Sequence, residues 1–336
     1  MSINYYLERV EPNDDWDSFL LKSNNSVLFS LSKYLKVVNG SPGCYFVYNN
    51  NELRAAISVL ESQDGKSTII NDRIIYNGII FGPELKDKNK SQKFSDRFRI
   101  IQFISDQLTS IYDSIEISLD PSINDIRPFL WVNYGTHLPK YAVNVRYTSY
   151  VKIDDFFLSK KNNDIQTFKN ASAARRQEIR YAKRKNVKTK ENFDPELFIE
   201  FYEMTMDRQK AKIENPNLNQ GRKATLDEIK KLIIELYNNK LGNMYSSYTA
   251  DGDLGSIAFF AMDHIRAYYL FGANDPKIRS HHTGTAVIWD AFKFLSAKGI
   301  KEVDLEGVNS PNRGWFKLSF GGSLLPYYNL KWNNYY

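Results

Sequence analysis

The chain has 336 residues, and its shares of hydrophobic residues (42%) and charged residues (25%) exclude a protein that is mainly disordered. The length predicts two domains of roughly 150 residues each. The formal net charge of +6 predicts an anionic partner, such as a nucleic acid or a phosphorylated metabolite.

The single cysteine, Cys44, excludes an intrachain disulfide and favours a reducing compartment. It stands in the apolar run CYFVY, so we expect it in the core rather than at a reactive site. The N-terminus lacks a basic start followed by an apolar stretch, and no later run reaches the roughly 18 apolar residues of a membrane span. We therefore expect a cytoplasmic protein without membrane insertion.

The first half of the chain shows a hairpin, a strand, a helix and a further strand. The runs CYFVY and RAAISVL are strand-like and are joined by the turn-prone NNNE. A strand-like IIYNGIIFGP follows, then SQKFSDRFRIIQFISDQLTSIY with helical periodicity, then the strand-like SIEISLD. This order predicts a mixed, mostly antiparallel sheet flanked by helices.

The second half repeats this order at a spacing of about 190 to 200 residues, which favours duplication of a domain over chance similarity. MYSSYTA and GSIAFFAM flank the turn DGDL, and AYYLFGA precedes a helix, TAVIWDAFKFLSAK, which Gly299 closes. The strand-like KEVDLEG ends the unit. We predict an α/β protein with domains at 1–155 and 156–336, the last strand being a candidate to return to the first domain.

A strongly basic segment opens the second half. Residues 171–190 carry eight Lys and Arg against one Glu. On a helix, Arg176, Arg180, Lys183 and Arg184 fall within about a third of the circumference. A solvated helix face is one interpretation, and an anion site is the other, because acidic partners at i, i+4 are missing.

A polar loop leads into the helix that contains Gly284. A helix start offers backbone N–H groups and a partial positive charge, which suit a pyrophosphate. The hydroxyls of Thr283 and Thr285 are candidate donors, and Arg279, His281 and His282 are candidates to add charge or hydrogen bonds. The alternative is a capped helix after a surface loop.

The third segment of interest is KEVDLEGVNSPNRGWFKLSFGG. A strand end delivers Asp304 and Glu306, which share a face if the strand persists. A loop with Asn309 and Asn312 follows, and Lys317 stands among aromatic residues, where it would be partly desolvated. Solvated acids and a snorkelling lysine are the alternative.

Motifs of other chemistries are missing. The sequence has neither HExxH nor CxxC, so we predict no metal site, and it has no GxSxG or GxxxxGK[ST] segment.

Residues 267–322 resemble the second half of Fem-type transferases, double-GNAT proteins that build peptidoglycan cross-bridges. The shared order is a strand, a helix ending in Ala-Lys-Gly, an Asp-Leu-x-Gly strand end and a Phe-Lys-x-x-Phe-Gly close. RRQEIRYAKRKNV is similar to the family's arginine-rich helix. FSLSKYLKV resembles a family segment in which an aromatic residue, here Tyr34, is followed two positions later by a phosphate-contacting lysine, here Lys36. In IIYNGIIFGP, Phe81 replaces the arginine of an Arg-Gly-Pro strand end. The resemblance implies two tandem GNAT-like domains.

Within that superfamily the chain is similar to N-acyltransferases that acylate nucleotide-linked amino sugars. HHTGTA resembles the GNAT pyrophosphate motif, with His281 in place of Arg or Gln. The resemblance implies acyl-CoA as co-substrate, no permanently bound cofactor, and donor-binding residues Phe271, Gly272, Ala273, Arg279, His281, His282, Thr283, Gly284, Thr285, Ala286, Asn309 and Asn312.

The same resemblance implies roles at the reacting centre. Backbone N–H groups of residues 271–273 would hold the oxyanion, and Lys317 would help to hold either the oxyanion or the acceptor phosphates. Glu306 or Asp304 would accept the amine proton, with a solvent base as the alternative. The first domain would bind the acceptor, with Tyr34, Lys36, Arg176 and Arg180 on its phosphates.

Two other functions remain open. One is a Fem-type transferase that uses aminoacyl-tRNA; residues 191–240 lack the long coiled-coil insertion of several such enzymes, but some members also lack it. The other is a catalytically silent double-GNAT module that binds a nucleotide sugar or a nucleic acid.

Overall fold

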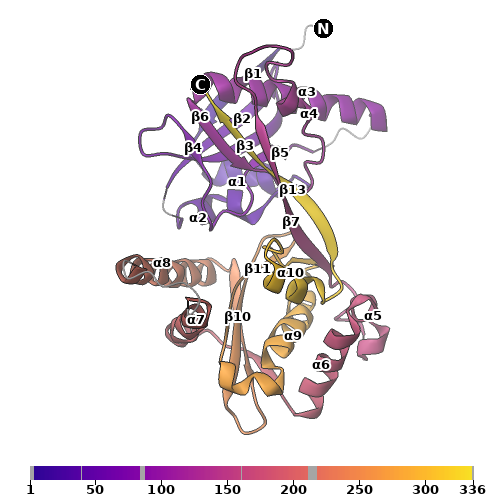
Figure 1. Cartoon of the computed structure of the whole chain (residues 1–336). Helices are drawn as coiled ribbons and strands as arrows, with labels where there is room; N and C mark the ends of the chain where they lie inside the picture. Colours follow the sequence, from indigo (N-terminus) through magenta and orange to yellow (C-terminus); the bar gives the residue numbers. More distant parts are fainter. Residues whose placement is uncertain (1–3, 39, 84–87, 160, 211–217, 335–336) are drawn as a thin grey trace. The chain divides into compact units, whose positions relative to one another are not determined.

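The chain divides into two compact units, each with its own sheet and core (Figure 1). The first unit comprises residues 1–146 and 326–336, and the second comprises residues 147–325. Two long strands, β7 and β13, run from one unit into the other. The computed structural model describes residues 4–38, 40–83, 88–159, 161–210 and 218–334.

The first unit is built mostly of strands. They are β1 (Tyr5–Val10), β2 (Ser41–Asn49), β3 (Glu52–Glu61), β4 (Thr68–Ile69), β5 (Gly78–Phe81), β6 (Ser114–Ser118), β7 (Ala142–Lys152) and β13 (Ser323–Asn333). Its helices are α1 (Asp14–Leu21), a 3₁₀ turn η1 (Leu28–Ser30), α2 (Ser32–Leu35), α3 (Lys90–Ile111) and α4 (Arg127–Trp131).

The strands β1 to β4 form an antiparallel sheet in chain order, and β5 also pairs with β3. Alternate residues of β3 point to opposite faces. Ala55, Ile57 and Val59 share a core with the apolar face of α3, and Trp16 of α1 stacks on Phe46. Helices therefore cover both faces of this sheet. The predicted strand IIYNGIIFGP is shorter than expected, because only β5 is paired.

Cys44 lies in β2 and is fully buried. Burial raises the pKa of its thiol to about 12, so it stays protonated at neutral pH. The expectation that Cys44 is a core residue is confirmed.

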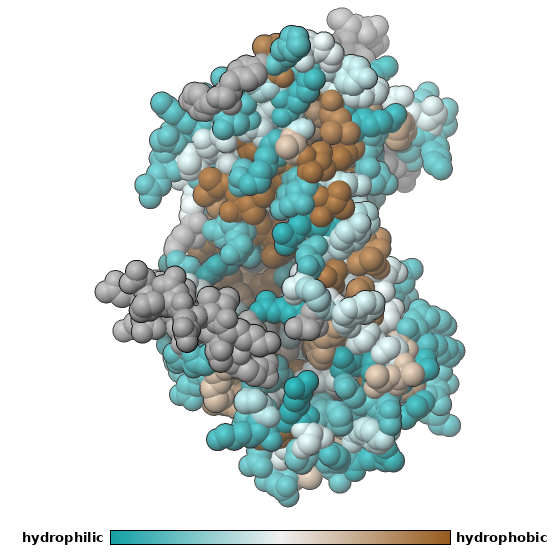
Figure 2. Space-filling model, viewed as in Figure 1, coloured by the Kyte–Doolittle hydropathy of each residue, from teal (hydrophilic) through white to brown (hydrophobic). Residues whose placement is uncertain are grey.

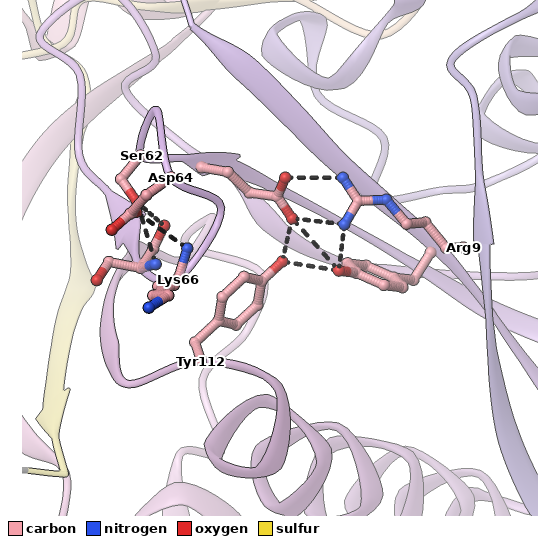
Figure 3. A network of polar contacts seen from close by, with 8 residues as sticks. Arg9, Ser62, Asp64, Lys66 and Tyr112 are labelled. Carbon is pink, nitrogen blue, oxygen red and sulfur yellow. Dashed lines mark hydrogen bonds and ion pairs between the residues drawn. The ribbon is translucent and has the colours of Figure 1, made fainter.

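A buried carboxylate, that of Glu61, ties together three elements of the first unit (Figure 3). Arg9 donates to both of its oxygens, at 2.9 and 2.7 Å, and the Tyr112 hydroxyl donates at 2.6 Å. The Tyr45 hydroxyl lies 2.8 Å from that of Tyr112. Burial acts to raise the pKa of Glu61, but the hydrogen bonds from Arg9 and Tyr112 outweigh it and hold the pKa below its usual range.

The second unit is a sheet with helices on both faces. Its strands are β8 (Lys188–Glu191), β9 (Gly242–Tyr248), β10 (Leu254–Met262), β11 (Ala267–Asn274) and β12 (Glu302–Asp304), with part of β7. Its helices are η2 (Asn162–Asp164), α5 (Gln166–Asn170), α6 (Ala173–Arg184), α7 (Pro195–Lys210), α8 (Leu218–Asn238), η3 (Pro276–His281), α9 (Thr283–Ala297) and α10 (Pro311–Leu318).

These strands follow the order β7-β12-β11-β10-β9-β8 within an eight-stranded sheet that also includes β13 and β6, and among these six strands only the β11–β12 pair is parallel. Helix α9 packs on one face, where Trp289 and Phe292 join Ala258 and Phe260 of β10 in a core. Helices α7 and α8 lie on the other face (Figure 1). The predicted fold class, mixed α/β with two mostly antiparallel sheets flanked by helices, is confirmed.

The surfaces of the two units differ in polarity. On the face drawn in Figure 2, hydrophobic residues gather on the first unit, whereas the second is largely hydrophilic. Trp131 is an exposed hydrophobic side chain of the first unit, and its ring centroid lies 5.8 Å from Cζ of Arg127. In the part of the chain that the structure describes, no helix is long and apolar enough to cross a membrane.

Candidate active site

The two parallel strands of the second unit separate after a short contact. β11 and β12 pair only at Ala267↔Val303 and Tyr268↔Asp304. β12 ends at Asp304, whereas β11 continues to Asn274. The edge of β11 beyond Tyr268 therefore has no pairing with β12 and borders an opening in the sheet.

The direction of the N–H groups along β11 follows from two hydrogen bonds. The N–H of Asp275 donates to a carbonyl of β10 at 2.9 Å, and the N–H of Asn274 donates the other way, to Thr205 Oγ1 of α7 at 3.2 Å. Successive N–H groups of a strand point to opposite sides. The N–H of Gly272 therefore lies on the β12 side, at the opening.

The same alternation applies to the neighbours of Gly272. The N–H groups of Phe271 and Ala273 point toward β10 and belong to the antiparallel ladder. Of the three expected oxyanion donors, only Gly272 faces the opening. The side chain of Phe271 packs on α7, with its ring centroid 6.0 Å from that of Tyr202.

The first turn of α9 has backbone donors to spare. His282 precedes it in the left-handed region, with φ 59°, and its carbonyl accepts from the N–H groups of Thr285 and Ala286 at 3.1 and 3.0 Å. Among the described residues, the N–H groups of Thr283 and Gly284 have no acceptor. Two N–H groups without an acceptor and the helix dipole are features that suit an anion.

Basic side chains surround the loop before this turn. Lys185, just after α6, donates through Nζ to the Ser280 carbonyl at 2.7 Å, and the His282 ring stacks on Tyr181 of α6 at 5.7 Å. The Arg279 side chain is exposed, and His281 is half-buried. Burial lowers the pKa of His282, so the ring is mostly neutral at pH 7.

The threonine hydroxyls of this turn point into the protein. Thr283 and Thr285 are buried; the first bonds to Ser256 at 2.8 Å, and the second donates to Glu178 at 2.6 Å. Gly284 also faces inward, because a Cβ there would lie 2.6 Å from Asn274 Oδ1. The loop therefore offers backbone groups and surface cations rather than the expected hydroxyls, and Gly284 serves close packing.

The structure brings Asp304, Glu306 and Lys317 together. The strand does not persist to Glu306, as the sequence interpretation assumed. Glu306 has φ 51° and its N–H donates to Asp304 Oδ1 at 2.7 Å. Asp304 also accepts from the Thr148 hydroxyl. Lys317 donates through Nζ to the Glu306 carbonyl oxygen at 3.0 Å.

The pKa values of the Glu306 and Lys317 side chains are both shifted from their usual ranges. Burial, then the charge of Asp304, raises the pKa of Glu306 well above its usual range, and Lys317 opposes the shift. Burial lowers the pKa of Lys317, although the charges of Glu306 and Asp304 act to raise it. Glu306 Oε1 is buried and accepts no hydrogen bond from the described residues. The site thus holds a buried carboxyl group with a raised pKa near the Lys317 side chain.

Tyr269 is a site residue that the sequence did not single out. Its hydroxyl occupies the space where a Cβ of Gly272 would lie, and Lys317 Nζ stands 5.4 Å from its ring centroid. Burial raises the pKa of Tyr269, so its hydroxyl is protonated. The bulge in the β10–β11 ladder at this point turns Tyr269 toward Gly272, and no short-range sequence signal marks it.

Several predicted contacts have structural partners. The Asn309 amide binds the backbone of Tyr147, accepting at 2.8 Å and donating at 3.0 Å. Asn312 lies in α10, and its side chain is outside the described residues. Tyr34 is a buried core residue whose hydroxyl donates to a backbone carbonyl, whereas Lys36 is exposed.

The arginines of α6 divide by role. Arg176 donates to the carbonyls of Lys169 and Ala171 at 2.8 and 3.1 Å, at the end of α5. Arg180 is exposed and lies 5.2 Å from the Phe168 ring centroid. Arg175, which the helical-face prediction left out, is buried. Within the described residues no His, Cys, Asp and Glu group is arranged to hold a metal ion.

Comparison with known proteins agrees with this geometry. Residues 172–314 match the family model described as acetyltransferase (GNAT) domain. That span contains the unpaired part of β11, the α9 turn, Asp304 and Glu306, whereas Lys317 lies just beyond it. The match supports a GNAT acyltransferase fold for residues 172–314, which lie within the second unit. A search of curated protein sequences found no significant match.

Solved structures with this fold span the whole chain. FemX is 12% identical, with 96% of each chain covered and a TM-score of 0.61. A conserved protein of unknown function from Bacteroides thetaiotaomicron is 12% identical, with 97% of this chain and 99% of the other covered and a TM-score of 0.55. An acetyltransferase from the GNAT family of Colwellia psychrerythraea is 11% identical, with 98% and 99% covered and a TM-score of 0.51. Identities this low carry the fold alone.

Proposed function

We propose that this chain transfers an acyl group from acyl-CoA to a primary amine. The observation that carries the proposal is the first turn of α9, where the N–H groups of Thr283 and Gly284 have no acceptor among the described residues. Lys185 and Arg279 stand beside that turn. A pyrophosphate placed there would be held by two N–H groups, the helix dipole and two cations.

The chemistry needs an oxyanion donor and a proton acceptor. The amine nitrogen attacks the thioester carbonyl, the new C–N bond forms, the C–S bond breaks, and the thiolate leaves. The N–H of Gly272 is suited to receive the oxyanion at the sheet opening. Glu306 is the candidate acceptor of the amine proton, because its raised pKa makes its carboxylate a stronger base than an exposed one.

The acceptor we propose is a nucleotide-linked amino sugar, bound mainly by the first unit. Its support is the resemblance to sugar N-acyltransferases and the exposure of Lys36 in the first unit, which keeps this cation available to phosphates; Arg180 of the second unit is a separate candidate and is also exposed. Arg176 is a weaker candidate, since its guanidinium already binds two carbonyls. An acyl-CoA donor also suits the cytoplasmic location that the sequence predicts.

The second candidate is a Fem-type transferase that takes its acyl group from aminoacyl-tRNA. The likeness in fold to FemX favours it. A polyanion that contacts several cations releases several counterions, so its binding falls steeply with salt. Turnover of acetyl-CoA with a nucleotide-linked amino sugar should survive ribonuclease and fall only modestly up to physiological salt. A requirement for charged tRNA would favour the second candidate instead.

The donor site is tested by reversing one charge at the α9 turn. Arg279→Glu changes an exposed side chain, so the fold should persist. Since charge-assisted contacts contribute about 1.5–3 kcal/mol, calorimetry should show at least a tenfold weaker Kd for CoA. Lys301→Glu, an equal change in net charge at the far end of α9, is the matched control and should bind CoA as the wild type does. Equal affinity of the two variants would remove the donor-site assignment.

A further inference from the structure

Arg175 lies at the meeting point of three helices of the second unit. Its side chain comes from α6 and is 6% exposed. Its Nε donates to the Ser319 hydroxyl at 2.8 Å, and its guanidinium lies 4.3 and 4.4 Å from the ring centroids of Phe316 and Phe320. Arg175 thus holds the C-terminal end of α10 by a hydrogen bond and two cation–π contacts.

The same guanidinium reaches the first turn of α9. Its Nη1 donates to the hydroxyl of Thr285 and to the carboxylate of Glu178. The Thr285 hydroxyl donates in turn to Glu178 Oε2 at 2.6 Å. One planar group therefore links the helix start proposed for the donor phosphates to the helix that carries Lys317.

The end of α10 fits tightly where Arg175 binds it. The N–H of Ser172 donates to the Ser319 carbonyl at 3.0 Å. A Cβ at Gly321 would lie 2.7 Å from the backbone of Ala171 and of Thr167, so this stretch has little freedom to shift. Lys317 belongs to α10, and its Nζ reaches the Glu306 carbonyl from there.

We propose that Arg175 is a positioning residue, which fixes Lys317 relative to the α9 turn and neutralises Glu178 beside that turn. The inference rests on the proposed function. Glu178 is the only acidic residue in the segment 171–190, and its carboxylate bonds to the third residue of α9. Left unpaired, it would repel a diphosphate at the two free N–H groups.

The two parts of this role make separable predictions. Loss of the Arg175 charge weakens the affinity for the acyl donor, because the Glu178 carboxylate then lacks its cationic partner. Loss of the Arg175 contacts to α10 lowers turnover, because Lys317 is then displaced and a displacement of about 1 Å at a reacting centre can cost on the order of 100-fold in rate. A lysine at position 175 restores the charge but not the planar fork that binds Ser319 and Thr285 together.

The experiment compares Arg175→Met, Arg175→Lys, Glu178→Gln and the double variant Arg175→Met/Glu178→Gln. Calorimetry with CoA gives Kd, and thiol release from acetyl-CoA with a nucleotide-linked amino sugar gives kcat. Arg175→Met should weaken CoA binding about tenfold and lower kcat about 10- to 100-fold. The double variant should recover the wild-type Kd within threefold while kcat stays low, and Arg175→Lys should behave likewise.

Several results would overturn the inference. Arg175→Met with wild-type Kd and kcat would refute both parts of it. A double variant that bound CoA as weakly as Arg175→Met would refute the charge role, and an Arg175→Lys variant with full kcat would refute the geometric one. If Arg175→Met failed to fold by circular dichroism, Arg175→Lys and Glu178→Gln would still decide the matter. A wild-type protein that bound no CoA would instead overturn the proposed function, and this inference with it.

Discussion

Glu61→Gln should destabilise the first unit by about 2–3 kcal/mol. Removing one partner of a buried charge pair costs about 3–5 kcal/mol. The predicted loss is smaller than this range because the Arg9 side chain is 55% exposed and keeps part of its hydration when the carboxylate is lost. Glutamine keeps the shape of the side chain, but its amide N–H₂ would face an Arg9 donor whichever of the two oxygens it replaced (Figure 3).

The measurement is urea unfolding read by hydrogen exchange of β2 and β3 peptides, which reports the first unit separately from the second. The matched control is Glu52→Gln, because Glu52 is exposed and its Oε2 lies 3.2 Å from Arg54 Nη1. That pair should contribute no more than about 1 kcal/mol. Equal stability of the two variants at pH 7 would refute the reasoning.

Acidification gives a second check. The folded-state pKa of Glu61 is lowered, so its stabilisation is present above the unfolded pKa of about 4.3 and is lost as pH falls through the folded value. The difference between wild type and Glu61→Gln should therefore be full at pH 7 and shrink below about pH 4. A difference that grew on acidification would contradict the assignment of a charged, hydrogen-bonded Glu61.

Two further predictions concern the second unit. Glu306→Gln should lower kcat about 100- to 10,000-fold in the thiol-release assay, as expected for loss of a general base, while Kd for CoA stays within threefold; a loss below tenfold would show that solvent accepts the proton. Gly284→Ala should cost about 1–3 kcal/mol of stability, because its Cβ would crowd Asn274 at 2.6 Å. Thermal unfolding measures that loss, and an unchanged midpoint would contradict the packing role of Gly284.

The strands and long helices could be predicted because their signals are local. The apolar periodicity of α3 and α9 and the turn DGDL between β9 and β10 mark elements without reference to the rest of the chain. The end of β12 could not be predicted this way. Glu306 leaves the strand because its N–H bonds to the Asp304 side chain, a contact that the alternation of VDLE does not reveal.

The candidate site was predictable where charge alone was informative. A carboxylate and a lysine among apolar residues, as in DLEG and WFKLSF, indicate burial, and the structure brings Glu306 and Lys317 together. Tyr269 was missed, because one more tyrosine in a strand looks like core until the bulge turns it toward Gly272. The Thr283 hydroxyl was expected at the phosphates and instead bonds to Ser256, since the first turn of α9 packs against β10.

The basic segment shows most clearly why net charge does not equal binding capacity. Arg175 is buried against Glu178, and Arg176 binds carbonyls at the end of α5. On and directly after α6, Arg180, Lys183, Arg184 and Lys185 are exposed and lie within six consecutive positions, about 7.5 Å of helix axis at 1.5 Å per residue, and the exposed Lys188 and Lys190 follow on β8. A cluster that short can contact a few phosphates at once, which fits the phosphates of CoA or of a nucleotide sugar better than a long track on an RNA. The distribution of the exposed cations, rather than their number, therefore favours a small anionic substrate on this helix.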